Sequence, residues 1–205
     1  MRIDQCIQCL DFPCQDVIHA ACHIPPVDLD PAKVSVVLIS ESAAPDTADN
    51  YDAPGDPLFA RTTVLAFQDA GLSVTSIAEI RALGIHLTTA VKCAKTAYTL
   101  LPATIDACSR LLEAELDLFP QLKACLLMGD AAIRAVNTIS KRAGSGRVIP
   151  AGSTYKIRGQ DYFFRGARAF PSYLQAGPSF GLEKSKRRMI AEDIAAALKI
   201  AGLDG

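Results

Sequence analysis

Cysteine is the residue type whose spacing first indicates chemistry in this sequence. The chain has seven cysteines, and Cys6, Cys9 and Cys14 lie together in the opening stretch "CIQCLDFPC". Cys6 and Cys9 form a C-x2-C pair, a spacing that lets two thiolates reach one metal centre. The pair is compatible with zinc, with an iron–sulfur cluster or with a redox-active dithiol. The odd number of cysteines argues against a disulfide framework.

Two later cysteines extend the pair to four possible metal ligands. Cys93 ends a β-rich stretch, and Cys108 lies on the following helix fifteen residues later. Four cysteine ligands suit a 4Fe–4S cluster or a structural zinc ion. The candidate set is Cys6, Cys9, Cys93 and Cys108. Cys125, inside "KACLLMGD", instead fits a small buried hydrophobic residue.

The elements that position these residues alternate between strands and helices. Short β-branched or alternating runs predict strands at 34–40, 85–93 and 123–129, with two β-like stretches near "STYKI" and "DYFF". Helical spacing and Gly or Pro at the ends predict helices at 58–71, 76–84, 102–119, 130–140 and 187–203. This alternation predicts a single α/β domain over residues 1–205 with a mostly parallel sheet.

The loops that follow the strands are the expected location of a functional site. In parallel α/β sheets, ligands bind beyond the carboxyl ends of the strands. The loops in question span 41–57, 92–101 and 170–183. A basic run follows the last of them and includes Lys184, Lys186 and Arg187, which could contact phosphate or form a solvated helix face.

Composition limits the possible partners. The formal net charge is −1, so nucleic-acid binding would need a local basic surface. Half of the residues are hydrophobic, which is enough for a sizeable core. We find neither a signal-peptide pattern nor an apolar run of about 20 residues. We therefore expect a soluble cytoplasmic monomer without a membrane partner.

Several short motifs follow one another along the chain in a characteristic order. They are the C-x2-C pair, "SESAAPD" (40–46), "GDPLF" (55–59), "LTTAVKC" (87–93), "MGDAA" (128–132) and "FPSYLQ" (170–175). Together they resemble the motifs of the uracil-DNA glycosylase superfamily, in particular its iron–sulfur branch called family 4. The resemblance implies a three-layer α/β/α fold with a mostly parallel central sheet.

The resemblance also implies a cofactor and its ligands. A 4Fe–4S cluster would be held by Cys6, Cys9, Cys93 and Cys108, away from the chemistry, and zinc is the alternative. This cluster would pack the Cys-rich segment 1–30 onto the domain. The segment is longer than its counterpart in the family, so Cys14 or Cys22 could replace Cys6 or Cys9 as a ligand.

The same resemblance implies roles for individual residues in hydrolysing the N-glycosidic bond of a base flipped out of DNA. Glu41 matches the catalytic loop acid, which acts near the sugar or on water. The base pocket would contain Ser42, Phe59, Thr89 and Phe170, with Phe59, or else Tyr51, stacking on the base. Duplex or single-stranded DNA would meet Ser172, Leu174, Lys184, Lys186 and Arg187, with Leu174 as a wedge.

Three departures from the family pattern bear on activity. Ser40 and Ser42 stand where the family has glycines, Thr89 replaces the base-reading Asn, and Phe170 replaces a His. Loss of one donor to the developing anion typically costs about 2.7–4 kcal/mol of barrier. We expect either excision of uracil or another damaged base, or a protein without this activity that binds nucleic acid or acts as an iron–sulfur redox sensor.

Overall fold

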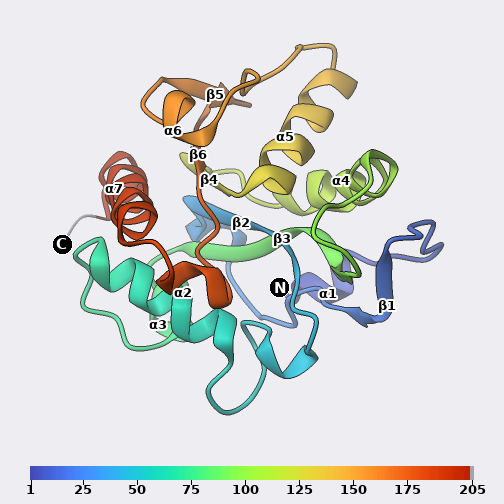
Figure 1. The fold of residues 1–205 in the computed structure, drawn as a ribbon, viewed down its shortest axis with the longest axis horizontal. Coiled ribbons are helices and arrows are strands. Elements are labelled where there is room, and N and C mark those ends of the chain that lie inside the picture. Colours follow the sequence, from blue (N-terminus) through green and yellow to red (C-terminus); the bar gives the residue numbers. More distant parts are fainter. Residues whose placement is uncertain (204–205) are drawn as a thin grey trace.

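A six-stranded sheet forms the centre of the computed structural model, which describes residues 1–203 (Figure 1). Its strands are β1 (Val17–Cys22), β2 (Val36–Ala43), β3 (Ile85–Lys95), β4 (Ala124–Met128), β5 (Tyr162–Phe164) and β6 (Ala167–Ser172). The order β1-β3-β2-β4-β6-β5 places four parallel strands in the middle and antiparallel β1 and β5 at the edges. The predicted α/β class with a mostly parallel sheet is confirmed.

Helices cover both faces of the sheet and give three layers (Figure 1). One face packs against α4 (Pro102–Leu116) and α5 (Asp130–Arg142). The other packs against α2 (Leu58–Asp69), α3 (Ile77–Ala82) and α7 (Lys184–Ala201). Successive side chains of a strand point to opposite faces. The central strands are therefore buried on both faces, and β3 also buries polar side chains, among them His86, Thr88 and Lys92.

Strand β6 is the main difference from the predicted elements. We predicted a loop from residue 170 onward, but Ala167–Ser172 pairs with β4 on one side and β5 on the other. Pro171 argued against a strand at this position in the sequence, because proline cannot donate a ladder hydrogen bond and is rare in central strands. Pairing with two neighbours outweighs that local signal.

The stretch "STYKI" is a short helix, α6 (Thr154–Ile157), and not the β-like segment that we predicted. The residue after it, Arg158, donates to the carbonyl of Met189 at 2.8 Å and pairs with Asp193 of α7 at 2.7 Å. These tertiary contacts hold the turn, and local β propensity does not decide its conformation.

The N-terminal segment packs on the domain through strand pairing and apolar side chains. Strand β1, which we did not predict, pairs with β3, and α1 (Ile3–Cys6) precedes it. Ile3, Ile7 and Val17 are buried in the core on the α4 side of the sheet. Packing of this segment through a metal cluster stays a prediction.

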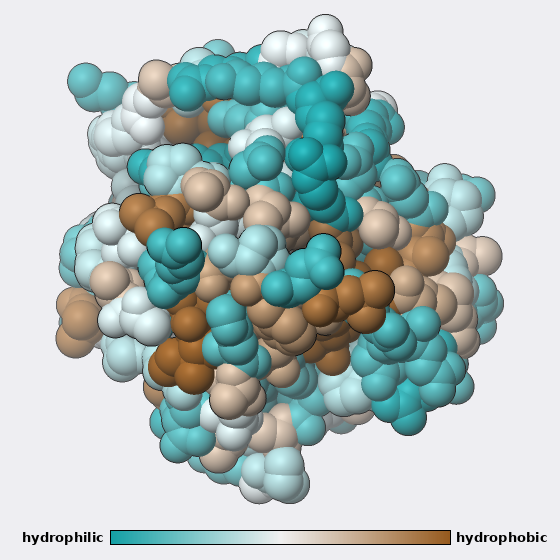
Figure 2. All heavy atoms as spheres, turned by 90° about the vertical axis from the view of Figure 1, so that its right-hand side faces the viewer, coloured by the Kyte–Doolittle hydropathy of each residue, from teal (hydrophilic) through white to brown (hydrophobic). Residues whose placement is uncertain are grey.

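Figure 2 shows the face that carries α4 and β1. Hydrophobic residues reach the surface in a band across its middle, whereas the upper part is hydrophilic. Exposed hydrophobic side chains of the segments on this side include Leu10, Ile18 and Leu101. Among the described helices, none combines the length and the apolar character that crossing a membrane requires.

Candidate functional site

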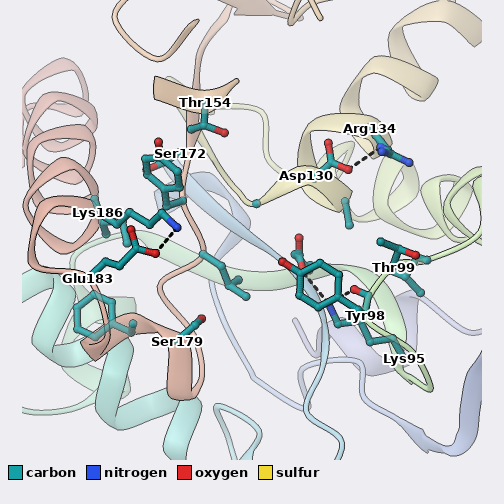
Figure 3. Close-up of a pocket in the computed structure, with 18 of the residues that line it drawn as sticks. Lys95, Tyr98, Thr99, Asp130, Arg134, Thr154, Ser172, Ser179, Glu183 and Lys186 are labelled. Carbon is teal, nitrogen blue, oxygen red and sulfur yellow. Dashed lines mark hydrogen bonds and ion pairs between the residues drawn. The ribbon is translucent and has the colours of Figure 1, made fainter. Parts of the chain in front are cut away.

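A cleft of about 440 Å³ opens where the parallel strands end (Figure 3). Each of the four parallel strands contributes a residue within two positions of its carboxyl end: Glu41, Lys95, Gly129 and Ser172. One wall carries residues 98–100 and the start of α5, and the other carries residues 179–186. This is the edge at which ligands bind in parallel α/β sheets, and the volume suits a small-molecule or nucleotide site.

Glu41 is held in the cleft by an ion pair and by a glycine. Its carboxylate accepts a hydrogen bond from Lys95 Nζ at 2.8 Å, and the two side chains are 19% and 25% exposed. Gly129 has a φ of +95°, and a Cβ there would lie 2.7 Å from Glu41 Oε1. A larger residue at this position would therefore push the carboxylate aside.

The charged groups of the cleft lining are balanced. Each of its three cations pairs with a carboxylate: Lys95 with Glu41, Arg134 with Asp130 at 2.7 Å, and Lys186 with Glu183 at 2.6 Å. The last two pairs are exposed, and exposed pairs contribute little to stability. The cleft therefore has no excess positive charge that would attract phosphate at long range.

The predicted base-pocket residues do not line this cleft. Phe59 is buried and packs against Tyr51, with ring centroids 5.6 Å apart. Phe170 is buried within β6, and the guanidinium of Arg168 lies 4.7 Å from its ring centroid. Ser42 and Thr89 are also buried in the sheet. These four residues are therefore absent from the cleft lining that contains Glu41, and their role in a base pocket stays a prediction.

A buried polar cluster occupies the region next to Phe59. The side-chain amide of Gln175 lies 3.0 Å from Ser40 Oγ and 2.9 Å from the Tyr51 hydroxyl. It also lies 3.2 Å from Thr63 Oγ1. Burial raises the pKa of Tyr51 more than its hydrogen bonds lower it, so its hydroxyl keeps its proton at neutral pH. The sequence did not predict this cluster. Gln175 is the last residue of the motif "FPSYLQ", to which no role was assigned at that position, and Thr63 belongs to none of the motifs.

Thr89 adds an unsatisfied group beside this cluster. It pairs in register with Ser40 across β2 and β3. Thr89 is 4% exposed, and its hydroxyl has no hydrogen-bond partner among the described residues. Buried polar groups without partners are rare and often mark functional positions. A hydroxyl at this point can donate one hydrogen bond to a ligand.

The predicted DNA-binding residues fall into two groups. Three of them line the cleft: Ser172, Leu174 and Lys186. Lys184 is exposed at the start of α7. Arg187 is held at the surface by Asp69, with Nη2 2.8 Å from Oδ1. Sequence reasoning missed Lys95 and Tyr98 as cleft residues, although both lie in the loop that we expected to be functional.

The thiols gather partly around the start of α4. Cys22 and Cys93 pair in register across β1 and β3, and Cys108 Sγ accepts a hydrogen bond from the Lys92 amide at 3.2 Å. Burial raises the pKa of Cys108 to about 11. Cys14 precedes Asp16, whose carboxylate accepts from the Leu101 amide at 2.6 Å, next to the first turn of α4.

The predicted four-thiol set is not assembled in the described residues. Cys6 is exposed at the end of α1, whereas Cys93 and Cys108 are buried. Within residues 1–203, no three Cys, His, Asp or Glu side chains lie so that they could hold a metal ion. The chemistry of the donors suits an iron–sulfur cluster, but their present arrangement does not. The cofactor therefore stays a prediction.

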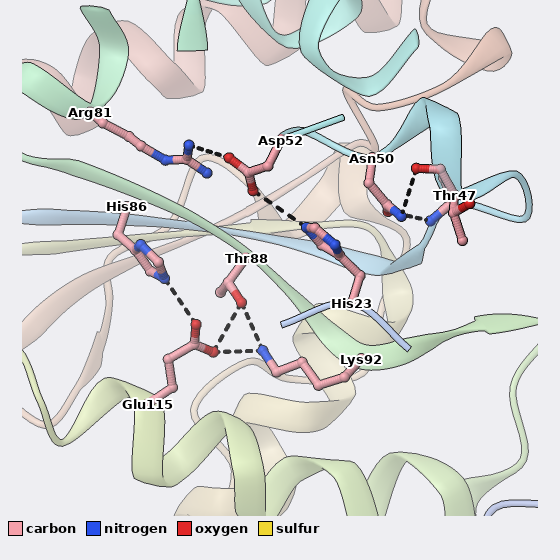
Figure 4. Close-up of polar contacts among 10 residues, drawn as sticks. His23, Thr47, Asn50, Asp52, Arg81, His86, Thr88, Lys92 and Glu115 are labelled. Carbon is pink, nitrogen blue, oxygen red and sulfur yellow. Dashed lines mark hydrogen bonds and ion pairs between the residues drawn. The ribbon is translucent and has the colours of Figure 1, made fainter. Parts of the chain in front are cut away.

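Two ionic networks support the strands behind the cleft (Figure 4). Under β3, Glu115 of α4 accepts hydrogen bonds from Lys92, at 2.5 Å, and from Thr88, at 2.9 Å, and its other oxygen contacts His86 Nε2 at 2.9 Å. All four side chains are buried. Burial alone would raise the Glu115 pKa, but Lys92 and His86 lower it to about 2, so the carboxylate is ionised.

The second network links the N-terminal segment to the loop after β2. Asp52 pairs with Arg81 of α3 and with His23 Nε2, the latter at 3.3 Å (Figure 4). Burial alone would raise the Asp52 pKa, but hydrogen bonds and charges of His23 and Arg81 lower it to about 2. Asp52 therefore joins three separate segments of the chain as an ionised carboxylate.

The fold and the cleft define an α/β protein with a candidate ligand site at the carboxyl edge of a parallel sheet. No family model matches the chain. Over 125 residues it is 27% identical to the type-5 uracil-DNA glycosylase of Thermus thermophilus. The match covers 61% of this chain and 54% of the relative, so the chain spans about half of that protein's length. Together with the fold, this similarity supports membership of the uracil-DNA glycosylase superfamily, as a divergent member.

Proposed function

We propose that the protein is a divergent DNA glycosylase that hydrolyses the N-glycosidic bond of a damaged or deaminated base flipped out of DNA. The similarity to a type-5 uracil-DNA glycosylase supports a DNA glycosylase-like function. The observation that carries the proposal is the position of Glu41. Its carboxylate lies in the cleft at the end of β2, in a space kept open by Gly129.

The proposed reaction breaks the bond between C1′ of the sugar and the base nitrogen. The bonding electron pair leaves with the base, and the sugar becomes oxocarbenium-like. Glu41 acts here by stabilising this positive charge or by accepting a proton from the attacking water, whose oxygen bonds to C1′. The departing base takes up a proton equivalent to the one that the attacking water loses, so the products are the free base and the sugar hydroxyl. Lys95 holds the Glu41 carboxylate in place.

We further propose that the base is recognised by the buried polar cluster together with Thr89. Phe170 has no donor, and Thr89 offers one hydroxyl where the family has an amide. Gln175 supplies an amide close to Ser40 and Tyr51, on a different segment of the chain. Ser42 and Phe59 would complete the pocket, with Phe59 against the face of the base.

We also propose an iron–sulfur cluster that joins the N-terminal segment to the domain. Cys9, Cys93 and Cys108 are taken as ligands, as the sequence predicts. For the fourth ligand we favour Cys14 over Cys6, because Asp16 holds the loop that carries Cys14 at the start of α4. Cys6 is exposed at the end of α1. Such a group would supply structural cross-linking, and no catalytic step depends on it.

A single-turnover assay tests the proposed function. Enzyme in excess is mixed with labelled duplex and single-stranded oligonucleotides that carry uracil, hypoxanthine, xanthine or a mismatched base. Abasic product is then read after alkaline strand cleavage. We expect cleavage of at least one substrate by the wild-type protein, and a loss of roughly 100- to 10,000-fold with Glu41→Gln.

Asp130→Asn is the matched control. Asp130 is a second carboxylate of the same cleft, but its side chain is 68% exposed and it pairs with Arg134. We expect its substitution to change the rate by less than about threefold, since exposed pairs contribute little. No cleavage of any substrate, or equal rates for wild type and Glu41→Gln, would contradict the proposal.

A further inference from the structure

Two tyrosines with lysines over their rings stand in the lining of the cleft. Lys95 Nζ lies 5.6 Å from the ring centroid of Tyr98, and Lys186 Nζ lies 5.5 Å from that of Tyr173. All four residues line the cleft. In Figure 3, Tyr98 and Lys95 lie on the α4 side, whereas Lys186 lies on the α7 side. Each side of the cleft therefore offers an aromatic surface next to a cation.

Tyr98 is the more exposed of the two rings. Its residue is 92% exposed, although it lies only three residues after the end of the buried strand β3. Lys95 donates to the Tyr98 carbonyl at 3.0 Å and to Glu41 at 2.8 Å. The loop that bears this ring is therefore tied to the cleft carboxylate. Leu182, which is 79% exposed, adds an apolar side chain to the opposite wall.

Aromatic side chains that are exposed to solvent at the opening of a polar cleft are suited to stack on unpaired bases. The bases of a duplex already cover one another, so they offer no free face to Tyr98. Stacking is tolerant of sequence, because every base has an aromatic face. The balanced charges of the lining limit the contribution of phosphate contacts, since each lysine must first leave its carboxylate.

We propose that the cleft is a binding site for single-stranded DNA, in which Tyr98 stacks on an unpaired base next to the nucleotide that reaches Glu41. Tyr173 takes the same role on the opposite side. Lys186 exchanges Glu183 for a flanking phosphate, whereas Lys95 keeps its contact with Glu41. This inference rests on the proposed function for the choice of DNA as the ligand. It adds that the bound DNA is single-stranded, and it names the residues that bind it.

Fluorescence anisotropy with the full chain tests the inference. The probes are a labelled mixed-sequence 12-mer without damaged bases and the same 12-mer in a duplex, each at several salt concentrations. We expect tighter binding of the single strand and a shallow salt dependence, corresponding to about two released phosphate counterions or fewer. Tyr98→Ala should weaken single-strand binding about 5- to 150-fold, and Tyr98→Phe should retain it.

Phe163→Ala is the matched control. Phe163 is an exposed aromatic residue on β5, 62% exposed, with Arg168 5.8 Å from its ring centroid. It lines a separate hollow and not the cleft. We expect this variant to bind the single strand as the wild type does. Because Tyr98 and Phe163 are both exposed, neither substitution should unfold the protein.

The inference fails if Tyr98→Ala binds the single strand as tightly as the wild type. It also fails if the duplex binds more tightly with a steep salt dependence, or if no single-strand binding occurs up to about 100 µM protein. These probes carry no base to excise, so their outcome is independent of catalysis. If no substrate is cleaved but single-strand binding depends on Tyr98, only the proposed function is rejected. If a substrate is cleaved but single-strand binding does not depend on Tyr98, only this inference is rejected.

Discussion

Lys95 and Glu41 join the carboxyl ends of two neighbouring parallel strands, with Lys95 Nζ 2.8 Å from the Glu41 carboxylate. The two residues are 54 positions apart in the sequence. The same ammonium group binds the carbonyl of Tyr98. The Lys95 side chain therefore contacts both the proposed catalytic carboxylate and the loop that carries Tyr98, which we propose to bind DNA.

Lys95→Met should lower the single-turnover excision rate about tenfold, because Glu41 loses the partner that orients it. Lys95→Arg should retain most of the rate, since the guanidinium can still reach the carboxylate. The measurement is the rate at saturating enzyme, together with the Kd for an uncleaved oligonucleotide. A role in positioning Glu41 is contradicted if Lys95→Met weakens binding alone and leaves the saturated rate unchanged.

Asp52 should make stability dependent on pH in the acid range. Its pKa is lowered to about 2 in the folded protein, against about 3.9 for an unperturbed Asp. A lowered pKa means that the ionised form favours folding, so the contribution is complete above about pH 4 and is lost as pH falls toward 2. At pH 7 it amounts to roughly 2–3 kcal/mol.

Urea unfolding of wild type and Asp52→Asn at pH 7, 5, 4 and 3 measures this contribution. We expect a stability difference that is constant between pH 7 and 5 and that shrinks below pH 4. Asp161→Asn is the control, because Asp161 pairs with Arg168 but its side chain is 80% exposed. A difference between wild type and Asp52→Asn that stays the same down to pH 3 would contradict the assignment.

Glu115→Gln should destabilise the protein by about 3–5 kcal/mol, because it leaves the Lys92 ammonium buried without a counter-charge. Adding Lys92→Met to this variant should restore part of the loss, since the unpaired charge is then removed. The free energy of unfolding in urea measures both effects. Strictly additive losses in the double variant would show that the two residues do not act as a pair.

The thiol ligands can be identified by iron and sulfide content after anaerobic reconstitution. We expect Cys14→Ser, Cys93→Ser and Cys108→Ser to lose most of the bound iron, and Cys6→Ser to retain it. Cys125→Ser is the control, because Cys125 is fully buried in β4 and burial raises its pKa to about 12. Retention by Cys14→Ser with loss by Cys6→Ser would restore the ligand set expected from the sequence, and bound zinc without iron would reject the cluster.

Several features followed from the sequence because they depend on local patterns. Short β-branched runs and helical spacing depend on neighbouring residues alone, so alternating strands and helices were predicted with ends close to the observed ones. Parallel strands end at a common edge of the sheet, which was enough to predict a functional loop over residues 41–57, and its first residue lines the cleft. The candidate thiols were recognised by residue type, but the sequence did not predict how they are arranged in space.

The tertiary structure decided what depends on contacts between distant residues. Gln175 reaches Ser40 across 135 positions, and β6 forms in spite of Pro171 because β4 and β5 pair with it. The sequence alone determined the class of fold and the edge of the sheet at which the cleft lies. Only the tertiary structure decided which side chains share the cleft with Glu41 and which are buried behind it. The reason is that strand order and helix packing bring together residues that are far apart in the sequence, and local periodicity carries no information about such contacts.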